Sequence, residues 1–165
     1  MAGLEDLYRE IILDHYRTPR NRGTLDTPPA HMAKGHNPLC GDEIEVYLLL
    51  EGDPGSETVS DIRIGGQGCS ISQSSASMMS QAVKGRSVSE ARELVHAFKS
   101  MMSIEDGHDH EDGADDGAEP GVKMGDLEAL QGVVKYPVRI KCATLAWNTL
   151  ALGLDEAETG DPSVN

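Results

Sequence analysis

Aromatic residues are scarce in this sequence, which has one tryptophan, one phenylalanine and four tyrosines among 165 residues. A chain of this length fits one ordinary domain and can bury a core without disulfide bonds. Because aromatic side chains are few, aliphatic residues and methionine must fill most of that core.

Long apolar runs are also missing. No stretch approaches the roughly 20 apolar residues that a membrane-spanning helix needs. The N-terminal sequence MAGLEDLYRE lacks the basic segment that opens a secretory signal peptide. We therefore expect a cytoplasmic protein without a membrane partner.

Basic residues are in deficit, with 14 lysines and arginines against 28 acidic residues and a net charge of −14. This balance argues against binding to nucleic acid or to anionic membranes, since both require clustered basic side chains. Two segments, 105–119 and 155–161, hold 12 of the 28 acidic residues. The rest of the chain has 16 acidic and 14 basic residues and is nearly neutral, so a protein partner need not be basic.

Cysteines are few, and their number, three, is odd. In the cytoplasm thiols stay reduced, so a disulfide framework is not expected. Three cysteines in that compartment favour a metal site or reactive sulfur.

The apolar pattern predicts an α+β fold, in which a small antiparallel sheet has helices packed on one face. Alternating residues predict strands at 43–50 and 57–64, joined as an antiparallel hairpin. The segment 24–38 is expected to be an extended loop with a short edge strand. Four helices are also predicted. The first spans 3–16, and the second runs from the glycine cluster at 65–68 to about 84. The third begins at the Ser87–Glu90 capping box, and the fourth runs from 137 to about 154.

These elements predict one domain over residues 1–154. Its acidic, glycine-rich insertion at about 105–121 is too polar to order itself, so a mobile loop is expected there. Residues 155–165 are expected to form a disordered acidic tail.

Each cysteine lies at the boundary of a predicted element. Cys40 precedes a strand within NPLCGDE, next to Gly41 and two residues before Asp42. Cys69 follows a glycine cluster at a helix start, and Cys142 lies near the start of the last helix. Helix N-termini lower the pKa of a thiol, and thiolate is the form that binds metal and attacks sulfur.

Three thiolates and the Asp42 carboxylate would suit a tetrahedral Zn²⁺ site. Arg139 and Lys141, beside Cys142, would provide charge support by offsetting the excess negative charge. The spacing alone leaves open a second interpretation, in which the cysteines are separate buried residues. The glycines around Cys69 and the charges around Cys142 favour a shared site.

Histidines and arginines offer further candidates. His31 and His36 are expected on a loop that meets solvent or a partner, and His108 and His110 on the acidic loop, in neither case as preferred ligands. A separate group of arginines at the end of the first helix either complements the helix C-terminus or forms a docking surface. These arginines are Arg17, Arg20 and Arg22.

Four stretches together resemble the IscU/NifU N-terminal family of iron–sulfur cluster assembly, and most closely its SufU branch. They are 7–23, 37–48, 65–79 and 133–147, and they contain all three cysteines. Matched by position, the family's metal ligands are Cys40, Asp42, Cys69 and Cys142. IscU-type members have a histidine directly before the third cysteine, whereas this chain has Lys141, as in the SufU branch. The insertion is unusually acidic for that branch.

The resemblance implies a zinc-dependent sulfur acceptor that takes persulfide sulfur from a PLP-dependent cysteine desulfurase of the SufS type. Cys40 would be the acceptor and would pass sulfur to a SufBCD-type assembly complex. The chain would then be a sulfurtransferase-like partner of the desulfurase, rather than a stand-alone enzyme, and a monomer or weak homo-oligomer.

Two other hypotheses stay open. The same four ligands could hold iron or a [2Fe–2S] cluster, which would make the chain a scaffold for cluster assembly. A purely structural zinc domain is the third possibility, and it predicts that no persulfide forms.

Overall fold

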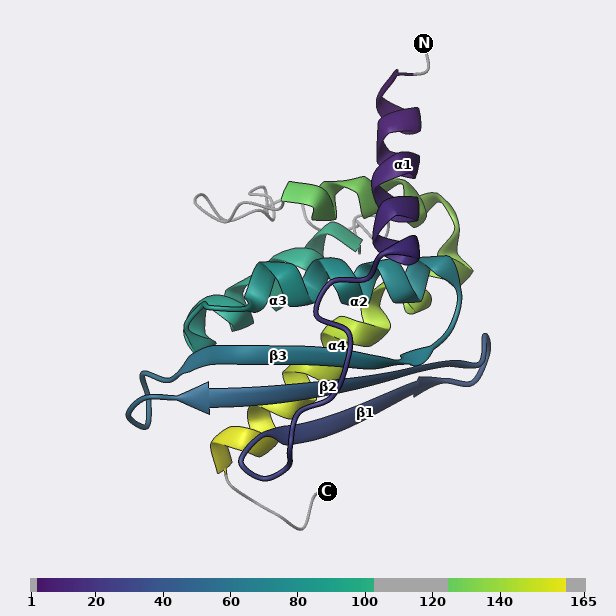
Figure 1. Cartoon of the computed structure of the whole chain (residues 1–165). Coiled ribbons are helices and arrows are strands. Elements are labelled where there is room, and N and C mark those ends of the chain that lie inside the picture. Colours follow the sequence, from purple (N-terminus) through teal and green to yellow (C-terminus); the bar gives the residue numbers. More distant parts are fainter. Residues whose placement is uncertain (1–2, 103–124, 160–165) are drawn as a thin grey trace.

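The centre of the fold is a hairpin of two long strands. In the computed structural model, which describes residues 3–102 and 125–159, β2 (Asp42–Glu51) pairs antiparallel with β3 (Thr58–Gln67). This confirms the predicted hairpin. β1 (His31–Asn37) pairs antiparallel with the other edge of β2, so the strand order is β1-β2-β3 (Figure 1). The predicted edge strand therefore exists and is longer than expected, and it includes His31 and His36, which are not on a loop.

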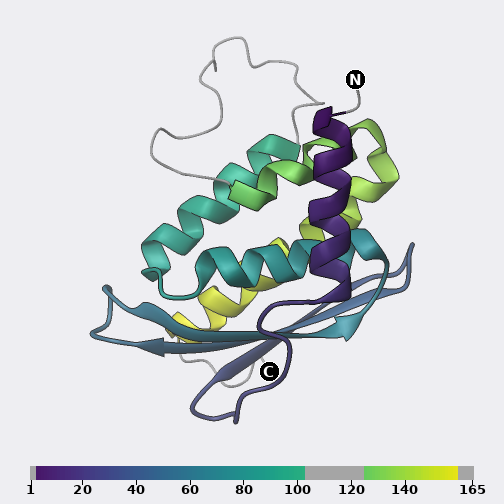
Figure 2. The same ribbon diagram turned by 45° about the horizontal axis from the view of Figure 1, so that its top comes forward.

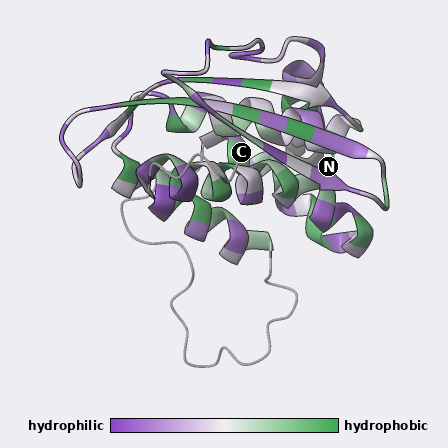
Figure 3. Cartoon of the chain, turned by 90° about the horizontal axis from the view of Figure 1, so that it is seen from below, coloured by the Kyte–Doolittle hydropathy of each residue, from purple (hydrophilic) through white to green (hydrophobic). Residues whose placement is uncertain are grey.

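The sheet buries one face more deeply than the other because its side chains alternate. Along β2, Ile44, Val46 and Leu48 are almost fully buried, while Glu43 between them and the turn is exposed. Hydrophilic and hydrophobic residues alternate along the strands (Figure 3). Such alternation is typical of an antiparallel sheet with one face against the core.

Helices cover the buried face of the sheet in two layers. α4 (Pro137–Thr159) packs against β1 and β2, and α2 (Ser70–Val83) packs beside α4 next to β3. Outside this pair, α1 (Gly3–Arg17) contacts α2, α3 (Val88–Met102) contacts α4, and the 3₁₀ helix η2 (Gly125–Lys135) contacts α1 and α4 (Figure 2). The α+β prediction, with helices on one face of a small sheet, is confirmed.

Contacts of two buried side chains, Phe98 and His15, fix the outer helices. Phe98 of α3 stacks on Trp147 of α4 with ring centroids 4.6 Å apart. The fully buried His15 of α1 lies between α2 and η2, with Nδ1 2.7 Å from Ser77 Oγ and Nε2 3.0 Å from Asp126 Oδ2. None of the described helices combines the length and the apolar character needed to cross a membrane.

The last helix is longer than predicted. It ends at Thr159, not near 154, so residues 155–159 belong to α4 and not to a disordered tail. Tertiary contacts explain the extension: His31 Nε2 lies 2.6 Å from Glu156 Oε1, and Arg92 forms ion pairs with Asp155 and Glu158. The predicted acidic insertion at about 105–121 and residues 160–165 lie outside the described residues.

Candidate metal centre

The turn between β1 and β2 presents Cys40 at one end of the sheet. Backbone N–H groups of Cys40 and Gly41 donate to the carbonyl oxygen of Asn37, at 3.2 and 2.8 Å. Gly41 has a φ of +72°, a conformation that glycine adopts without steric cost, and it completes the tight turn. As a result the Cys40 side chain is exposed, while the strands on either side are partly buried.

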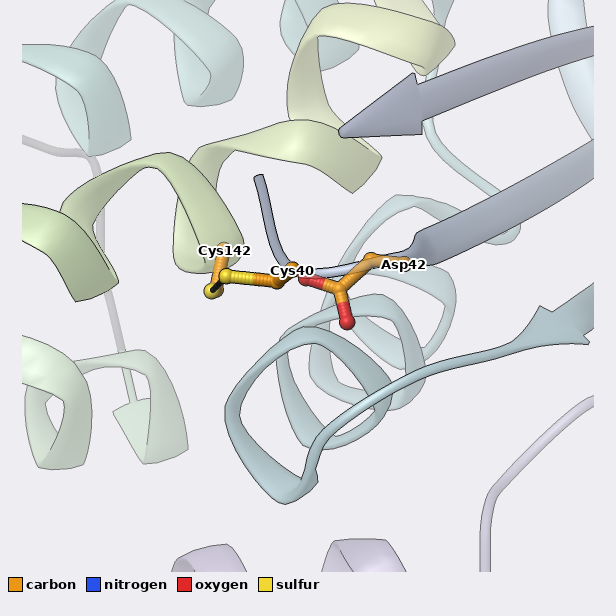
Figure 4. Close-up of side chains that lie close together, drawn as sticks. All are labelled: Cys40, Asp42 and Cys142. Carbon is orange, nitrogen blue, oxygen red and sulfur yellow. Dashed lines mark hydrogen bonds between the residues drawn. The ribbon is translucent and has the colours of Figure 1, made fainter. Parts of the chain in front are cut away.

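The Cys142 thiol meets Cys40 from the opposite side, carried by α4. The two Sγ atoms are 3.3 Å apart and point toward one another (Figure 4). Both residues are free cysteines, and Cys142 is fully buried. A residue of the exposed turn and a buried residue of α4, 102 positions apart, thus bring their sulfur atoms into contact.

Asp42 completes the group from the first position of β2. Its side chain is fully buried, and its Oδ1 atom accepts a hydrogen bond of 2.9 Å from the backbone N–H of Cys69. The Oδ2 atom is buried and has no hydrogen-bond partner among the described residues. A buried carboxylate oxygen without a partner costs folding free energy. Coordination of a metal cation would offset that cost.

The geometry therefore fits a metal ion. One ligand atom from each of Cys40, Asp42 and Cys142 lies within 4.8 Å of the other two, and within residues 3–102 and 125–159 no other group of three potential ligands meets this criterion. Sulfur ligands with one carboxylate oxygen match the preferences of Zn²⁺ and of iron in sulfur-rich sites.

The fourth predicted ligand, Cys69, lies beside this group but not within it. Cys69 is the N-cap of α2, as its position in the sequence predicts, and its Sγ atom accepts from the Ser72 N–H at 3.5 Å. Its backbone holds Asp42, and its side chain also acts electrostatically on Cys142. The structure thus brings three of the four predicted ligands together and places the fourth next to them.

The thiol of Cys142 does not have the lowered pKa that its sequence position suggests. Burial raises the pKa of Cys142 well above the usual range, and hydrogen bonds with Cys40 and Asp42 raise it further. Cys142 lies in the second turn of α4, past the free N–H groups at the helix start, so desolvation outweighs the helix dipole. A coordinated metal cation would reverse this balance, because it deprotonates a ligating thiol outright.

Of the two predicted charge-support residues, Arg139 interacts with the centre. Its pKa is raised by a side-chain hydrogen bond with Cys142 and by the charges of Cys69 and Cys142. Arg139 also lines a groove of about 640 Å³ that opens between α1, η2 and the starts of α2 and α4. Lys141 is exposed, and its role in charge support stays a prediction.

Three of the other candidate residues, His31, Arg20 and Arg22, have hydrogen-bond partners that are not ligands of the centre. His31 bonds to Glu156, and His36 is exposed on β1. Arg20 bonds to the Asp14 carboxylate, whereas Arg22 bonds to the side chain of Gln73 and to the carbonyl of Gly66. These arginine contacts support a structural role. The remaining two histidines, His108 and His110, lie outside the described residues.

Asn37 is a residue of the centre that the sequence gives little reason to choose. Its Nδ2 atom lies 4.0 Å from Cys142 Sγ, and the residue is 6% exposed. The Asn-Pro pair at 37–38 is a turn signal. Nothing in the sequence, however, connects this pair to a cysteine 105 residues away.

The centre has no room for a side chain at Gly68, and a substitution there tests whether this matters. A Cβ atom there would lie 2.5 Å from both Asp42 Oδ1 and Ser72 Oγ. We expect Gly68→Ala to displace the Asp42 carboxylate, to weaken Co²⁺ binding by about 10-fold or more, and to destabilise the metal-free chain by roughly 1–3 kcal/mol. Optical Co²⁺ titration and denaturant unfolding measure the two effects.

The matched control is Gly132→Ala, because a Cβ at that position meets no atom within 4 Å. It should bind Co²⁺ as the unmodified chain does. If both alanine variants bind equally well, the close packing at Gly68 does not position Asp42.

Comparison with known proteins assigns the chain to a family. The family model described as the NifU-like N terminal domain matches residues 7–143, a range that includes all four predicted ligands. The chain belongs to the family of NifU-like N-terminal domains. The predicted resemblance is therefore confirmed, together with its link to the SufU and IscU members.

Two relatives within this family show the range of names it carries. The zinc-dependent sulfurtransferase SufU of Bacillus subtilis is 43% identical over 160 residues, which cover 97% of each chain. The iron–sulfur cluster assembly scaffold protein IscU of Streptococcus pyogenes is 37% identical over 150 residues, covering 91% of this chain and 84% of the relative.

Solved structures support the same assignment. A candidate iron–sulfur cluster assembly scaffold protein for the SUF system from Fervidobacterium islandicum superposes with a TM-score of 0.72 at 30% identity, covering 92% of this chain and 99% of the other. The N-terminal NifU-like protein of Brucella abortus gives a TM-score of 0.74 at 25% identity, with 96% and 99% covered.

Proposed function

We propose that this chain is a zinc-dependent sulfur acceptor, which takes persulfide sulfur from a PLP-dependent cysteine desulfurase of the SufS type for iron–sulfur cluster assembly. One observation carries the proposal: the sulfur of Cys40, a residue on an exposed turn, lies 3.3 Å from the sulfur of the buried Cys142, beside a buried Asp42 oxygen that has no hydrogen-bond partner among the described residues. The 43% identity to a zinc-dependent sulfurtransferase supports zinc over other metals.

Cys40, Asp42, Cys69 and Cys142 would hold the metal. A bound zinc ion would keep the thiols deprotonated and ready for reaction at neutral pH. Three features of the chain serve this chemistry: Asp42 is oriented by the Cys69 N–H, Cys142 is shielded from solvent, and Arg139 places positive charge beside the sulfurs.

Cys40 is the sulfur acceptor in this proposal because its side chain is exposed and lies on a turn, whereas Cys142 is fully buried. The Cys40 thiolate attacks the terminal sulfur of the desulfurase persulfide. A new S–S bond forms on Cys40 while the S–S bond of the donor breaks. The donor cysteine leaves as a thiolate with the electron pair, so the transfer involves no net oxidation or reduction.

The partner that supplies sulfur must bring its persulfide to the end of the sheet where Cys40 lies. The groove of about 640 Å³ next to Arg139 offers a surface beside the centre for such docking. The sulfur would then pass to a SufBCD-type complex. The predicted cytoplasmic location suits this route, because thiols and persulfides persist in a reducing compartment.

A second candidate function is that of a scaffold on which a [2Fe–2S] cluster is assembled and transferred. The same sulfur-rich centre suits iron, and the 37% identity to a scaffold protein IscU favours this possibility. Lys141 stands where IscU-type members have histidine, and this difference favours a zinc-dependent sulfur acceptor over a cluster scaffold.

Metal analysis combined with a desulfurase assay tests the proposal. Protein purified aerobically is expected to contain one zinc per chain and to increase the turnover of a SufS-type desulfurase. Iron and acid-labile sulfide on the purified chain, transferable to an apo-protein and without an effect on turnover, would favour the scaffold instead. A chain that binds zinc but neither stimulates the desulfurase nor forms a persulfide would be a structural zinc domain.

A further inference from the structure

Asn37 lies where the sheet meets the centre, in contact with the backbone of Cys40 and with the sulfur of Cys142. It is the last residue of β1 and pairs across the hairpin with Asp42, the first residue of β2. Directly opposed residues of an antiparallel pair place their side chains on the same face of the sheet. Both side chains are accordingly buried on the face that α4 covers.

Asn37 contacts the turn of Cys40 and the thiol of Cys142 through different atoms. Its carbonyl oxygen accepts from the N–H groups of Cys40 and Gly41, and its Oδ1 atom accepts from the N–H of Leu39 at 3.2 Å. Its Nδ2 group instead points to Cys142 Sγ, at 4.0 Å. The residue therefore shapes the turn of Cys40 through oxygen atoms, and offers its only side-chain donor group to Cys142.

We propose that Asn37 is a positioning residue that keeps Cys142 as the unreactive sulfur of the centre and leaves Cys40 as the reactive one. This inference deepens the proposed function and rests on it. An N–H donor withdraws charge from a thiolate, so the sulfur that receives it becomes a poorer nucleophile. Mutation of a group that hydrogen-bonds to a metal ligand typically changes metal affinity or activity by about 10- to 100-fold.

Two substitutions separate the donor from the turn. Asn37→Asp keeps the Oδ1 acceptor for Leu39 and replaces the Nδ2 donor with an oxygen. Asn37→Ser keeps a short acceptor for the turn and loses the reach to Cys142. Asn148→Asp, an exposed position on α4, is the control for an added negative charge.

The experiment is competitive alkylation of the full, zinc-loaded chain with iodoacetamide, followed by mass spectrometry of the peptides that contain Cys40 and Cys142. We expect Cys40 to react first in the unmodified chain. In both Asn37 variants the rate ratio of Cys142 to Cys40 should rise by about 10-fold, whereas the Asn148 control should leave it unchanged. With Co²⁺ in place of zinc, the sulfur-to-metal absorption band should move to longer wavelength in the same two variants.

An unchanged ratio in correctly folded Asn37 variants would overturn the inference. Loss of the folded far-ultraviolet circular dichroism spectrum in both variants would also overturn it, because Asn37 would then serve the stability of the domain. The alkylation ratio is measured without a desulfurase, so its outcome does not depend on whether the chain accepts sulfur. That function fails on its own if the unmodified chain neither stimulates a desulfurase nor accepts sulfur.

Discussion

Replacing Cys40 with serine is expected to return a stimulated SufS-type desulfurase to its basal turnover. A serine hydroxyl is a far weaker nucleophile than a thiolate at neutral pH, so the terminal sulfur of the donor persulfide would have no acceptor. Because Cys40 lies on an exposed turn, the substitution should leave the fold intact. Steady-state sulfide or alanine production by the desulfurase measures the effect.

Cys142→Ser is the matched comparison for this result. It changes the same chemical group at a fully buried position, 3.3 Å from Cys40. We expect Cys142→Ser to lose bound zinc, because a ligand held in the interior is removed, while Cys40→Ser retains a larger share of it. Full stimulation by Cys40→Ser would show that another residue accepts the sulfur.

Replacing Asp42 with asparagine is expected to have opposite effects on metal binding and on the stability of the metal-free chain. Asparagine keeps an oxygen for the Cys69 N–H but removes the charge at the Oδ2 position, which is buried without a partner among the described residues. Zinc affinity should fall by about 100-fold or more, because a charged ligand is lost. The metal-free chain should gain roughly 1–3 kcal/mol in stability, because one oxygen of the buried, charged carboxylate has no hydrogen-bond partner among the described residues.

Zinc competition with a chromophoric chelator and denaturant unfolding of metal-free protein measure the two effects. Asp53→Asn, at an exposed turn position between β2 and β3, is the control and should change neither. Unchanged zinc affinity in Asp42→Asn would remove Asp42 from the ligand set. A less stable metal-free variant would show that the carboxylate already has a favourable environment without the metal.

Local sequence patterns were sufficient to predict most elements of the fold. The capping box is present as predicted: Ser87 Oγ accepts from the Glu90 N–H, and Glu90 Oε1 accepts from the Ser87 N–H. The hairpin follows from alternation and turn residues. Each of these signals lies within a few residues, where backbone preferences decide the structure.

The features that could not be predicted from the sequence depend on contacts between segments that lie far apart in the chain. The end of α4 depends on His31 and Arg92, which lie far from it in the chain. The raised pKa of Cys142 depends on burial beneath the turn of Cys40, which no local pattern records. For the same reason Asn37 was recognisable as a turn residue but not as a neighbour of Cys142. The metal centre itself was predicted from residue types, and its geometry came from the packing of α4 on β1 and β2.

The location of the transferred sulfur tests the central claim most directly. The full, zinc-loaded chain would be incubated with a SufS-type desulfurase and cysteine, trapped with an alkylating agent, and mapped by mass spectrometry without reduction. The proposal predicts one added sulfur atom on the peptide that contains Cys40 and none on the peptides of Cys69 and Cys142. Added sulfur on Cys142 or Cys69 with Cys40 unmodified, or no added sulfur on any cysteine, would contradict it.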